Sequence, residues 1–262
     1  MTAATETALD RIHRRLADAG AGSLTRFKSG YFERRLRTRF RARAVADPEA
    51  YADLLDTDPD ESRRLVSALA IGVTGFFRNP SAWRRLGELV AAEGRGGLRA
   101  WSAGCATGEE AWSLGLLLDG IPSLGGQWTV QATDLDDRSL AVARGGDYPA
   151  RVRPDIEAVR DPGIEAAEPD RYRVPAALRE RVRFARADLC AAPPAAELDL
   201  VLCRNVLIYF TADAQERILE GLLSSLRVGG LLMLGKAELA GFAFLPRLEI
   251  ADRAERLYRR IA

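Results

Sequence analysis

The chain repeats one local pattern from Leu98 onward: a short apolar run, a turn that begins with glycine or a polar residue, and then a helical run. The apolar runs are Leu98–Ala103, Trp128–Thr133, Val182–Ala187, Leu198–Cys203 and Leu231–Leu234. Strands that alternate with helices form a mostly parallel sheet with right-handed crossovers. We therefore predict an α/β fold with a doubly wound open sheet, in which a ligand binds at the carboxyl ends of the strands.

The helices between these runs have recognisable ends. A buried helix is predicted over Ala111–Leu118, and a second over Ile218–Leu226. Asp213 with Glu216 three residues later is typical of a capping box and predicts where the second helix begins. The pair Gly229-Gly230 is predicted to end it.

The first part of the chain differs, because its apolar residues recur at helical spacing with charged residues between them. Pro48 and Pro59 each follow an aspartate, which is typical of a helix that starts with an Asp cap. We predict a small all-helical domain over residues 1–85 and an α/β domain over residues 86–262. Within the latter, residues 149–181 are rich in Pro, Asp and Arg and are expected to form a subdomain or a long connection.

Composition excludes several kinds of protein. Lys+Arg number 38 against 37 Asp+Glu, so the global charge says little about partners. Three cysteines without CxxC spacing make a zinc site improbable, and no metal is expected. The amino terminus lacks the apolar core of a signal peptide, and no apolar run approaches the roughly 18 residues of a membrane helix. We expect a cytoplasmic protein that is not embedded in a membrane.

Two turns together favour a nucleoside ligand. The first strand enters a turn with Gly104 and Gly108, where the backbone can approach a ligand and helix amides can bind a carboxylate. The second strand ends at Asp134, whose carboxylate can accept hydrogen bonds from both ribose hydroxyls. Taken singly, the glycine turn is as often only a turn, and Asp134 is as often only a helix cap.

Further polar residues interrupt apolar segments. Asp188 closes the third strand, where it can contact an adenine amino group. Arg204 and Asn205 interrupt the run that reaches Tyr209, and polar groups in such a run need a partner from the protein or from a ligand. Tyr209 also suits an ordinary core position. Arg78 follows two phenylalanines between the two parts of the chain, where it forms an interface salt bridge or covers a ligand carboxylate.

Four motifs occur along the chain: TGFFRNP, WSAGCATGEE, ATDLD and CRNVLIYF. In this arrangement the sequence resembles the chemotaxis protein-glutamate methyltransferases, the CheR family, over nearly its whole length. The resemblance implies a Rossmann-like S-adenosylmethionine-dependent methyltransferase domain preceded by a small all-helical domain. It implies S-adenosyl-L-methionine as cofactor, S-adenosyl-L-homocysteine as product, and glutamate side chains of a methyl-accepting chemoreceptor as substrate. A CheR-like enzyme or binding module that serves another signalling pathway is the alternative.

The resemblance also implies residue roles. Thr74, Arg78 and Glu110 are expected at the methionine end of the cofactor, and Asp134 at the ribose. Arg78 and Tyr209 are expected nearest the transferred methyl group and are the catalytic candidates. The full cofactor-binding set is Gly72, Thr74, Arg78, Gly104, Glu110, Asp134, Asp188, Leu189, Arg204 and Asn205. Three places depart from the family: Gly72 replaces a residue that is often polar, Ala111 replaces a proline that commonly follows the motif's two glutamates, and Lys236-Ala-Glu238 replaces His-Ser-Glu.

The expected chemistry needs few catalytic groups. A glutamate carboxylate, with an ordinary pKa of roughly 4.3, is already an anionic nucleophile at neutral pH, so no general base is required. The only histidine is His13, far in sequence from the motifs. Base methylation of nucleic acid is disfavoured, because Asn205 is not followed by a Pro-Pro-aromatic turn.

The stretch from Arg26 to Arg43 carries eight basic residues against Glu33 alone. It is either a solvated helix face or a docking surface for an acidic, helical region of the receptor's cytoplasmic part. We expect the protein to be a monomer and not to bind nucleic acid.

Overall fold

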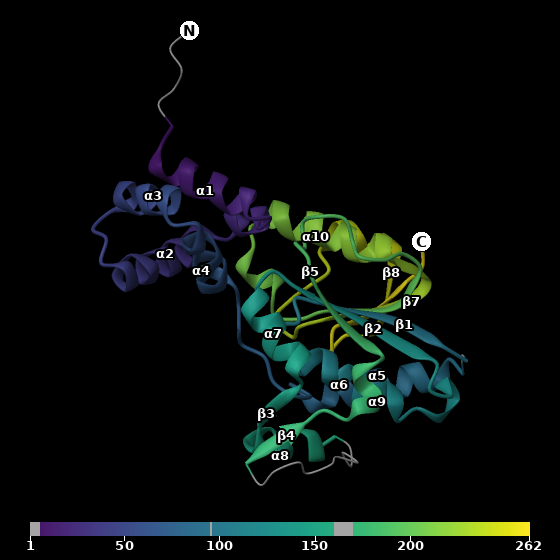
Figure 1. Ribbon diagram of the computed structural model, residues 1–262. Coiled ribbons are helices and arrows are strands. Elements are labelled where there is room, and N and C mark those ends of the chain that lie inside the picture. The colour runs from purple at the N-terminus through teal and green to yellow at the C-terminus, as the bar shows by residue number, and fades with distance from the viewer. Residues whose placement is uncertain (1–5, 95, 160–169) are drawn as a thin grey trace.

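The computed structural model describes residues 6–94, 96–159 and 170–262. Figure 1 shows a cluster of amino-terminal helices beside a larger unit built on a twisted sheet. The helical cluster comprises α1 (Ala8–Asp18), η1 (Gly22–Arg26), α2 (Ser29–Arg43), α3 (Pro48–Thr57) and α4 (Pro59–Leu69). Asp47 and Asp58 cap α3 and α4 through backbone amides, with proline in the first turn, so the predicted Asp-Pro helix starts are confirmed.

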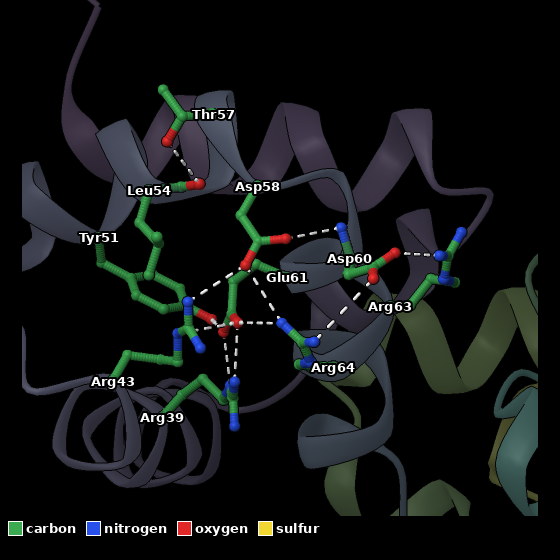
Figure 2. Close-up of polar contacts among 10 residues, drawn as sticks. All are labelled: Arg39, Arg43, Tyr51, Leu54, Thr57, Asp58, Asp60, Glu61, Arg63 and Arg64. Carbon is green, nitrogen blue, oxygen red and sulfur yellow. Dashed lines mark hydrogen bonds and ion pairs between the residues drawn. The ribbon is translucent and has the colours of Figure 1, made fainter.

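One buried carboxylate organises the polar side of this cluster. Glu61 is fully buried and accepts hydrogen bonds from Arg39 Nε at 2.6 Å and from the Tyr51 hydroxyl at 2.8 Å. Arg43 and Arg64 approach the same carboxylate, as Figure 2 shows. Burial alone would raise the pKa of Glu61, but the bonds from Arg39 and Tyr51 outweigh it and lower the pKa. Glu61 is therefore a buried anion that ties α2, α3 and α4 together.

Seven strands form the sheet in the order β5-β2-β1-β6-β7-β9-β8. The first five in this order are parallel neighbours, while β9 pairs antiparallel with β7 and β8. Chain order reverses between β1 and β6, the place where doubly wound sheets bind ligands. The strands are β1 (Leu98–Ala103), β2 (Trp128–Asp134), β5 (Val182–Arg186), β6 (Leu198–Cys203), β7 (Leu226–Leu234), β8 (Leu248–Asp252) and β9 (Leu257–Arg260).

Helices cover both faces of the sheet, and Figure 1 shows α10 on one face with α5 and α6 on the other. Apolar side chains of α10 and of the helical cluster share one core with one face of β1 and β6. The other face packs against α5, α6 and α7, with Trp83 and Trp112 fully buried. The elements are α5 (Pro80–Ala92), α6 (Glu109–Asp119), η2 (Pro122–Leu124), α7 (Asp137–Gly145), η4 (Leu207–Tyr209), α10 (Ala212–Ser225) and η5 (Phe242–Arg247).

The α/β prediction is confirmed, but two details near the carboxyl terminus are wrong. Helix α10 begins at Ala212, after Thr211, rather than at the expected Asp213–Glu216 capping box. It ends at Ser225, so Gly229-Gly230 lies inside β7, where the register against β6 shifts between Leu198 and Leu200. Gly229 has a φ of 83°, and this irregularity lets one long strand replace the expected turn. Strands β8 and β9 were not predicted.

The described residues between α7 and β5 form short elements. These are β3 (Asp147–Pro149), η3 (Ala150–Val152), α8 (Arg153–Glu157), β4 (Arg171–Arg173) and α9 (Ala176–Arg179), with β3 and β4 paired antiparallel. Part of the expected subdomain, residues 160–169, lies outside the described residues. Phe76 packs edge-on against Tyr148 and Tyr172, which joins this region to the segment between the two units. In the described ranges no helix is long and apolar enough to cross a membrane.

Candidate functional site

Two adjoining hollows lie at the carboxyl ends of the central strands. The first, called here the apolar pocket, is lined by Leu24, Phe27, Leu189 and Phe210, with Asp134 in its wall. The second, called the polar pocket, is lined by Thr74, Arg78, Glu110, Arg204 and Asn205 among others. Ile71, Gly104 and Val206 line both, so the two pockets are adjacent, and together they are called the groove here.

The end of β2 and the glycine turn after β1 are held together by Asp134. Its Oδ2 accepts a hydrogen bond from the Ala106 amide at 2.8 Å, and its Oδ1 accepts one from the Asp136 amide at 3.0 Å. Burial raises the pKa of this carboxyl. Gly104 has a φ of 80°, and a Cβ atom there would lie 2.8 Å from Val206 Cγ2, so only glycine fits. The carboxylate keeps lone pairs for a ligand's paired hydroxyls.

The polar pocket contains a buried ion pair. Glu110, in the first turn of α6, accepts a hydrogen bond from Ser102 Oγ at 2.9 Å and lies 3.5 Å from Arg204 Nη1. Burial raises the pKa of Glu110, although Arg204 opposes the shift, and burial lowers the pKa of Arg204. Arg204 Nε is buried without a hydrogen-bond partner among the described residues. An unpaired guanidinium donor in a pocket wall fits a ligand carboxylate.

Arg204 also holds the segment between the two units. Its Nη2 donates to the Arg78 carbonyl oxygen at 2.7 Å and to Asn79 Oδ1 at 3.2 Å, and its guanidinium lies over the Trp83 ring. The Arg78 side chain is exposed. It lines the polar pocket and also a third, open hollow that extends toward Asp155 in α8 and Ala158 at the end of that helix. Arg78 therefore stands where the groove meets the surface.

Glu238 is a site residue that the sequence analysis noted only as part of a departing motif. It is 3% exposed, and its carboxylate accepts four backbone hydrogen bonds of 2.7–2.8 Å, from the amides of Asn205, Val206, Leu207 and Gly235. These bonds fix the loop after β6, in which Asn205 has a φ of 61°. The glutamate that Lys236-Ala-Glu238 shares with the family pattern was the available signal, but three of its four partners lie 31–33 residues earlier in the chain.

Three predicted site residues lie apart from the pocket linings. Gly72 is exposed, and a Cβ atom there would meet nothing within 4 Å. Asp188 accepts hydrogen bonds from the Ser23 and Cys190 amides, both at 2.8 Å, while its neighbour Leu189 lines the apolar pocket. The Tyr209 ring packs 4.8 Å from that of Tyr31 and lines neither pocket within the described structure.

The groove's chemistry matches S-adenosylmethionine. An apolar slot suits an adenine ring, the Asp134 carboxylate suits ribose hydroxyls, and Glu110 with Arg204 suits the amino and carboxylate groups of methionine. The unpartnered Arg204 Nε is the observation that supports this fit. Fold and groove together define an S-adenosylmethionine-dependent methyltransferase.

Comparison with known proteins identifies the family. Residues 72–242 match the SAM-binding domain of CheR methyltransferases, and residues 23–70 match the all-alpha domain of the same family. The chain belongs to the CheR methyltransferase family, and S-adenosylmethionine is its cofactor.

Three relatives illustrate the range. The chain is 32% identical to chemotaxis protein methyltransferase 2 of Pseudomonas aeruginosa, covering 87% of this chain and 85% of that protein. It is 35% identical to the chemotaxis protein methyltransferase of Listeria monocytogenes, over 66% of this chain and 67% of that one. It is also 35% identical to an uncharacterized 104.1 kDa protein of Rhodobacter capsulatus, where the match covers 88% of this chain but only 25% of the relative.

Proposed function

We propose that this protein transfers the methyl group of S-adenosylmethionine to glutamate side chains in the cytoplasmic helical region of a methyl-accepting chemoreceptor. The observation that carries the proposal is an exposed arginine at the mouth of a groove that offers no general base among the described residues. His13 packs edge-on against Phe32 and lines neither pocket. The carboxylates of Glu110 and Asp134 line the groove, but we assign them to the amino group and the ribose hydroxyls of the cofactor rather than to the substrate. A substrate that arrives ionised, such as a glutamate carboxylate, needs no base.

The chain's own residues would position the reactants. S-adenosylmethionine supplies an electrophilic methyl group on a sulfonium. Asp134, Glu110 and Arg204 would hold the two ends of this donor, while Arg78 would orient the incoming carboxylate. Phe76 and Phe77, each at most 2% exposed, back the segment that carries Arg78. Because a carboxylate and a sulfonium neutralise each other in the transition state, an apolar wall on this side favours the transfer.

The direct test is to incubate the purified protein with methyl-labelled S-adenosylmethionine and receptor-containing membranes from its own organism. Label should enter a receptor-sized band and be released as methanol by mild alkali, because glutamyl methyl esters hydrolyse under those conditions. Label that survives alkali, or cofactor binding without any labelled protein, would contradict the proposal.

The role of Arg78 predicts a specific kinetic defect. Arg78→Ala should lower kcat/KM for receptor methylation by roughly 10- to 100-fold, since a hydrogen bond to a charged group is worth about 1.5–3 kcal/mol. Arg78→Lys should recover part of it. Tyr209→Phe tests the second catalytic candidate, and a fall in kcat at unchanged cofactor affinity would support it. If the alanine and phenylalanine variants both keep the wild-type rate, neither side chain orients the substrate.

The basic stretch is only partly available to a partner. Arg39 and Arg43 turn inward to Glu61, and Arg37 pairs with Glu33 on α2. Arg34 and Arg41 are exposed and form no ion pair with the described residues. These two arginines are the part of α2 that we propose attracts an acidic receptor helix.

This attraction should be screened by salt. Raising the ionic strength from about 50 to 200 mM should increase KM for the receptor several-fold while cofactor affinity stays constant. Reversing charge with Arg34→Glu and Arg41→Glu together should produce the same increase at low salt. Arg253→Glu, in the exposed turn between β8 and β9, is the matched control and should change neither value. Equal salt dependence of receptor and cofactor binding would exclude this docking surface.

A further inference from the structure

One hydroxyl in the wall of the apolar pocket has no explanation within the protein. Ser23 is 2% exposed, lines this pocket, and its Oγ is buried without a hydrogen-bond partner among the described residues. Its neighbour in the same turn of η1 behaves differently, because Thr25 Oγ1 donates to the Gly22 carbonyl oxygen at 2.8 Å. A buried hydroxyl without a partner is unfavourable, so a ligand atom is the natural partner for Ser23.

The backbone amide of Ser23 is hydrogen-bonded to Asp188, which places the Ser23 side chain beside the end of β5. The Ser23 amide donates to Asp188 Oδ2 at 2.8 Å, and Asp188 Oδ1 accepts from the Cys190 amide at 2.8 Å. Asp188 is thereby fixed just beyond the end of β5, beside Ala187 and Leu189 of the pocket wall. The Asp188 carboxylate, which only accepts hydrogen bonds, and the Ser23 hydroxyl, which can donate one, therefore lie close together in space.

This pair complements one edge of adenine. The six-membered ring presents an amino donor at N6 next to an acceptor at N1. We propose that Ser23 Oγ donates a hydrogen bond to N1 of the bound cofactor's adenine, next to the N6 amino group for which the sequence already suggests Asp188 as the acceptor. The helical domain would thereby form a hydrogen bond to the adenine base, in addition to the apolar contacts from Leu24 and Phe27. The inference rests on cofactor binding at this groove and not on the identity of the methyl acceptor.

The proposal predicts opposite effects on the free and the bound protein. Ser23→Ala removes a polar group that is unpaired in the free protein, so the melting temperature without ligand should stay constant or rise. The same change removes a ligand contact, so affinity for S-adenosylhomocysteine should fall roughly three- to tenfold. A purely structural serine would give the reverse, a less stable free protein with unchanged affinity.

The experiment is calorimetric titration of the full chain with S-adenosylhomocysteine and with its 1-deaza analogue, in which a C–H group replaces N1. Wild type should bind the analogue more weakly than the natural ligand, whereas Ser23→Ala should bind both equally. Thr25→Ala, which loses a hydroxyl satisfied inside η1, is the matched control and should retain the wild-type preference.

Two results would overturn the inference: wild-type affinity in Ser23→Ala, or a preference for N1 that survives in that variant. Neither result would touch the proposed glutamate esterification, because no receptor is used. Conversely, failure to methylate a receptor would leave the measured contribution of Ser23 to base recognition unchanged.

Discussion

Glu238→Ala should abolish measurable cofactor binding and lower the free energy of unfolding by at least about 3 kcal/mol. The carboxylate accepts hydrogen bonds from four backbone amides, three of them in the loop that supplies Asn205 and Val206 to the groove. Alanine would leave these donors without an acceptor in a region that solvent barely reaches. Each orphaned donor costs about 1–3 kcal/mol, and the loop can recover hydrogen bonds only by leaving its position.

Calorimetry with S-adenosylhomocysteine and denaturant unfolding would measure the two effects. Glu238→Gln keeps the shape but places an amide donor toward backbone donors, so it should fall between wild type and alanine in both measurements. Glu249→Ala, at an exposed position in β8, is the control and should match wild type. Near-normal binding by Glu238→Ala would show that the loop holds its conformation without the carboxylate.

Asp134→Asn should weaken cofactor binding about 100-fold without unfolding the protein. A carboxylate that accepts from two ribose hydroxyls makes two charge-assisted hydrogen bonds, each worth about 1.5–3 kcal/mol. The asparagine oxygen can replace one acceptor, but its amide group faces a backbone donor, since both carboxylate oxygens already accept from Ala106 and Asp136. A deoxyribose form of S-adenosylhomocysteine should bind wild type and variant with similar affinity.

The pH dependence of binding offers an independent check on Asp134. Burial raises its pKa above the ordinary value of roughly 3.9, so protonation begins at a higher pH than for an exposed aspartate. Cofactor affinity should be constant above this raised pKa and fall up to tenfold per pH unit below it. Glu110 has a pKa raised by burial as well, so Asp134→Asn should remove only part of the pH dependence. An unchanged profile in the variant would assign it entirely to Glu110.

The same shift has the opposite sign for folding. A carboxyl whose pKa is higher in the folded than in the unfolded state holds more protons when folded, so its contribution to stability grows as pH falls. Between the unfolded and folded pKa values, acidification should therefore weaken cofactor binding while these carboxyl groups favour the unliganded fold.

Much of the parallel sheet could be predicted from the sequence, because its strands are apolar runs with glycine or acidic residues at their ends. Leu98–Ala103 and Leu198–Cys203 are strands with the predicted bounds. The antiparallel β8 and β9 could not be found in this way, since both are short, both contain charged residues, and the burial of their side chains does not alternate. The motifs likewise pointed to Asp134, Glu110 and Arg204, which line the groove.

The roles of residues that act through contacts distant in sequence could not be predicted from the sequence. Nothing near Glu238 indicates that its partners are the amides of residues 205–207, because backbone donors have no sequence signature. Similarly, the eight basic residues from Arg26 to Arg43 suggested one exposed charged face, yet Arg39 and Arg43 form ion pairs with the buried Glu61 of α4. Nothing in the sequence distinguishes Ser23 from other serines, because only the structure shows that its buried hydroxyl lacks a hydrogen-bond partner among the described residues.

The apolar pocket takes walls from both sides of residue 71: Leu24 and Phe27 from the helical part, Leu189 and Phe210 from the sheet part. A chimaera that borrows the helical domain of another family member would therefore exchange some donor-binding residues along with the basic helix α2. Exchanging the whole helical domain to change the methyl acceptor would therefore also alter residues that line the pocket for the methyl donor. If α2 binds the receptor as proposed, point substitutions on its outer face should change the use of the methyl acceptor without weakening binding of the methyl donor.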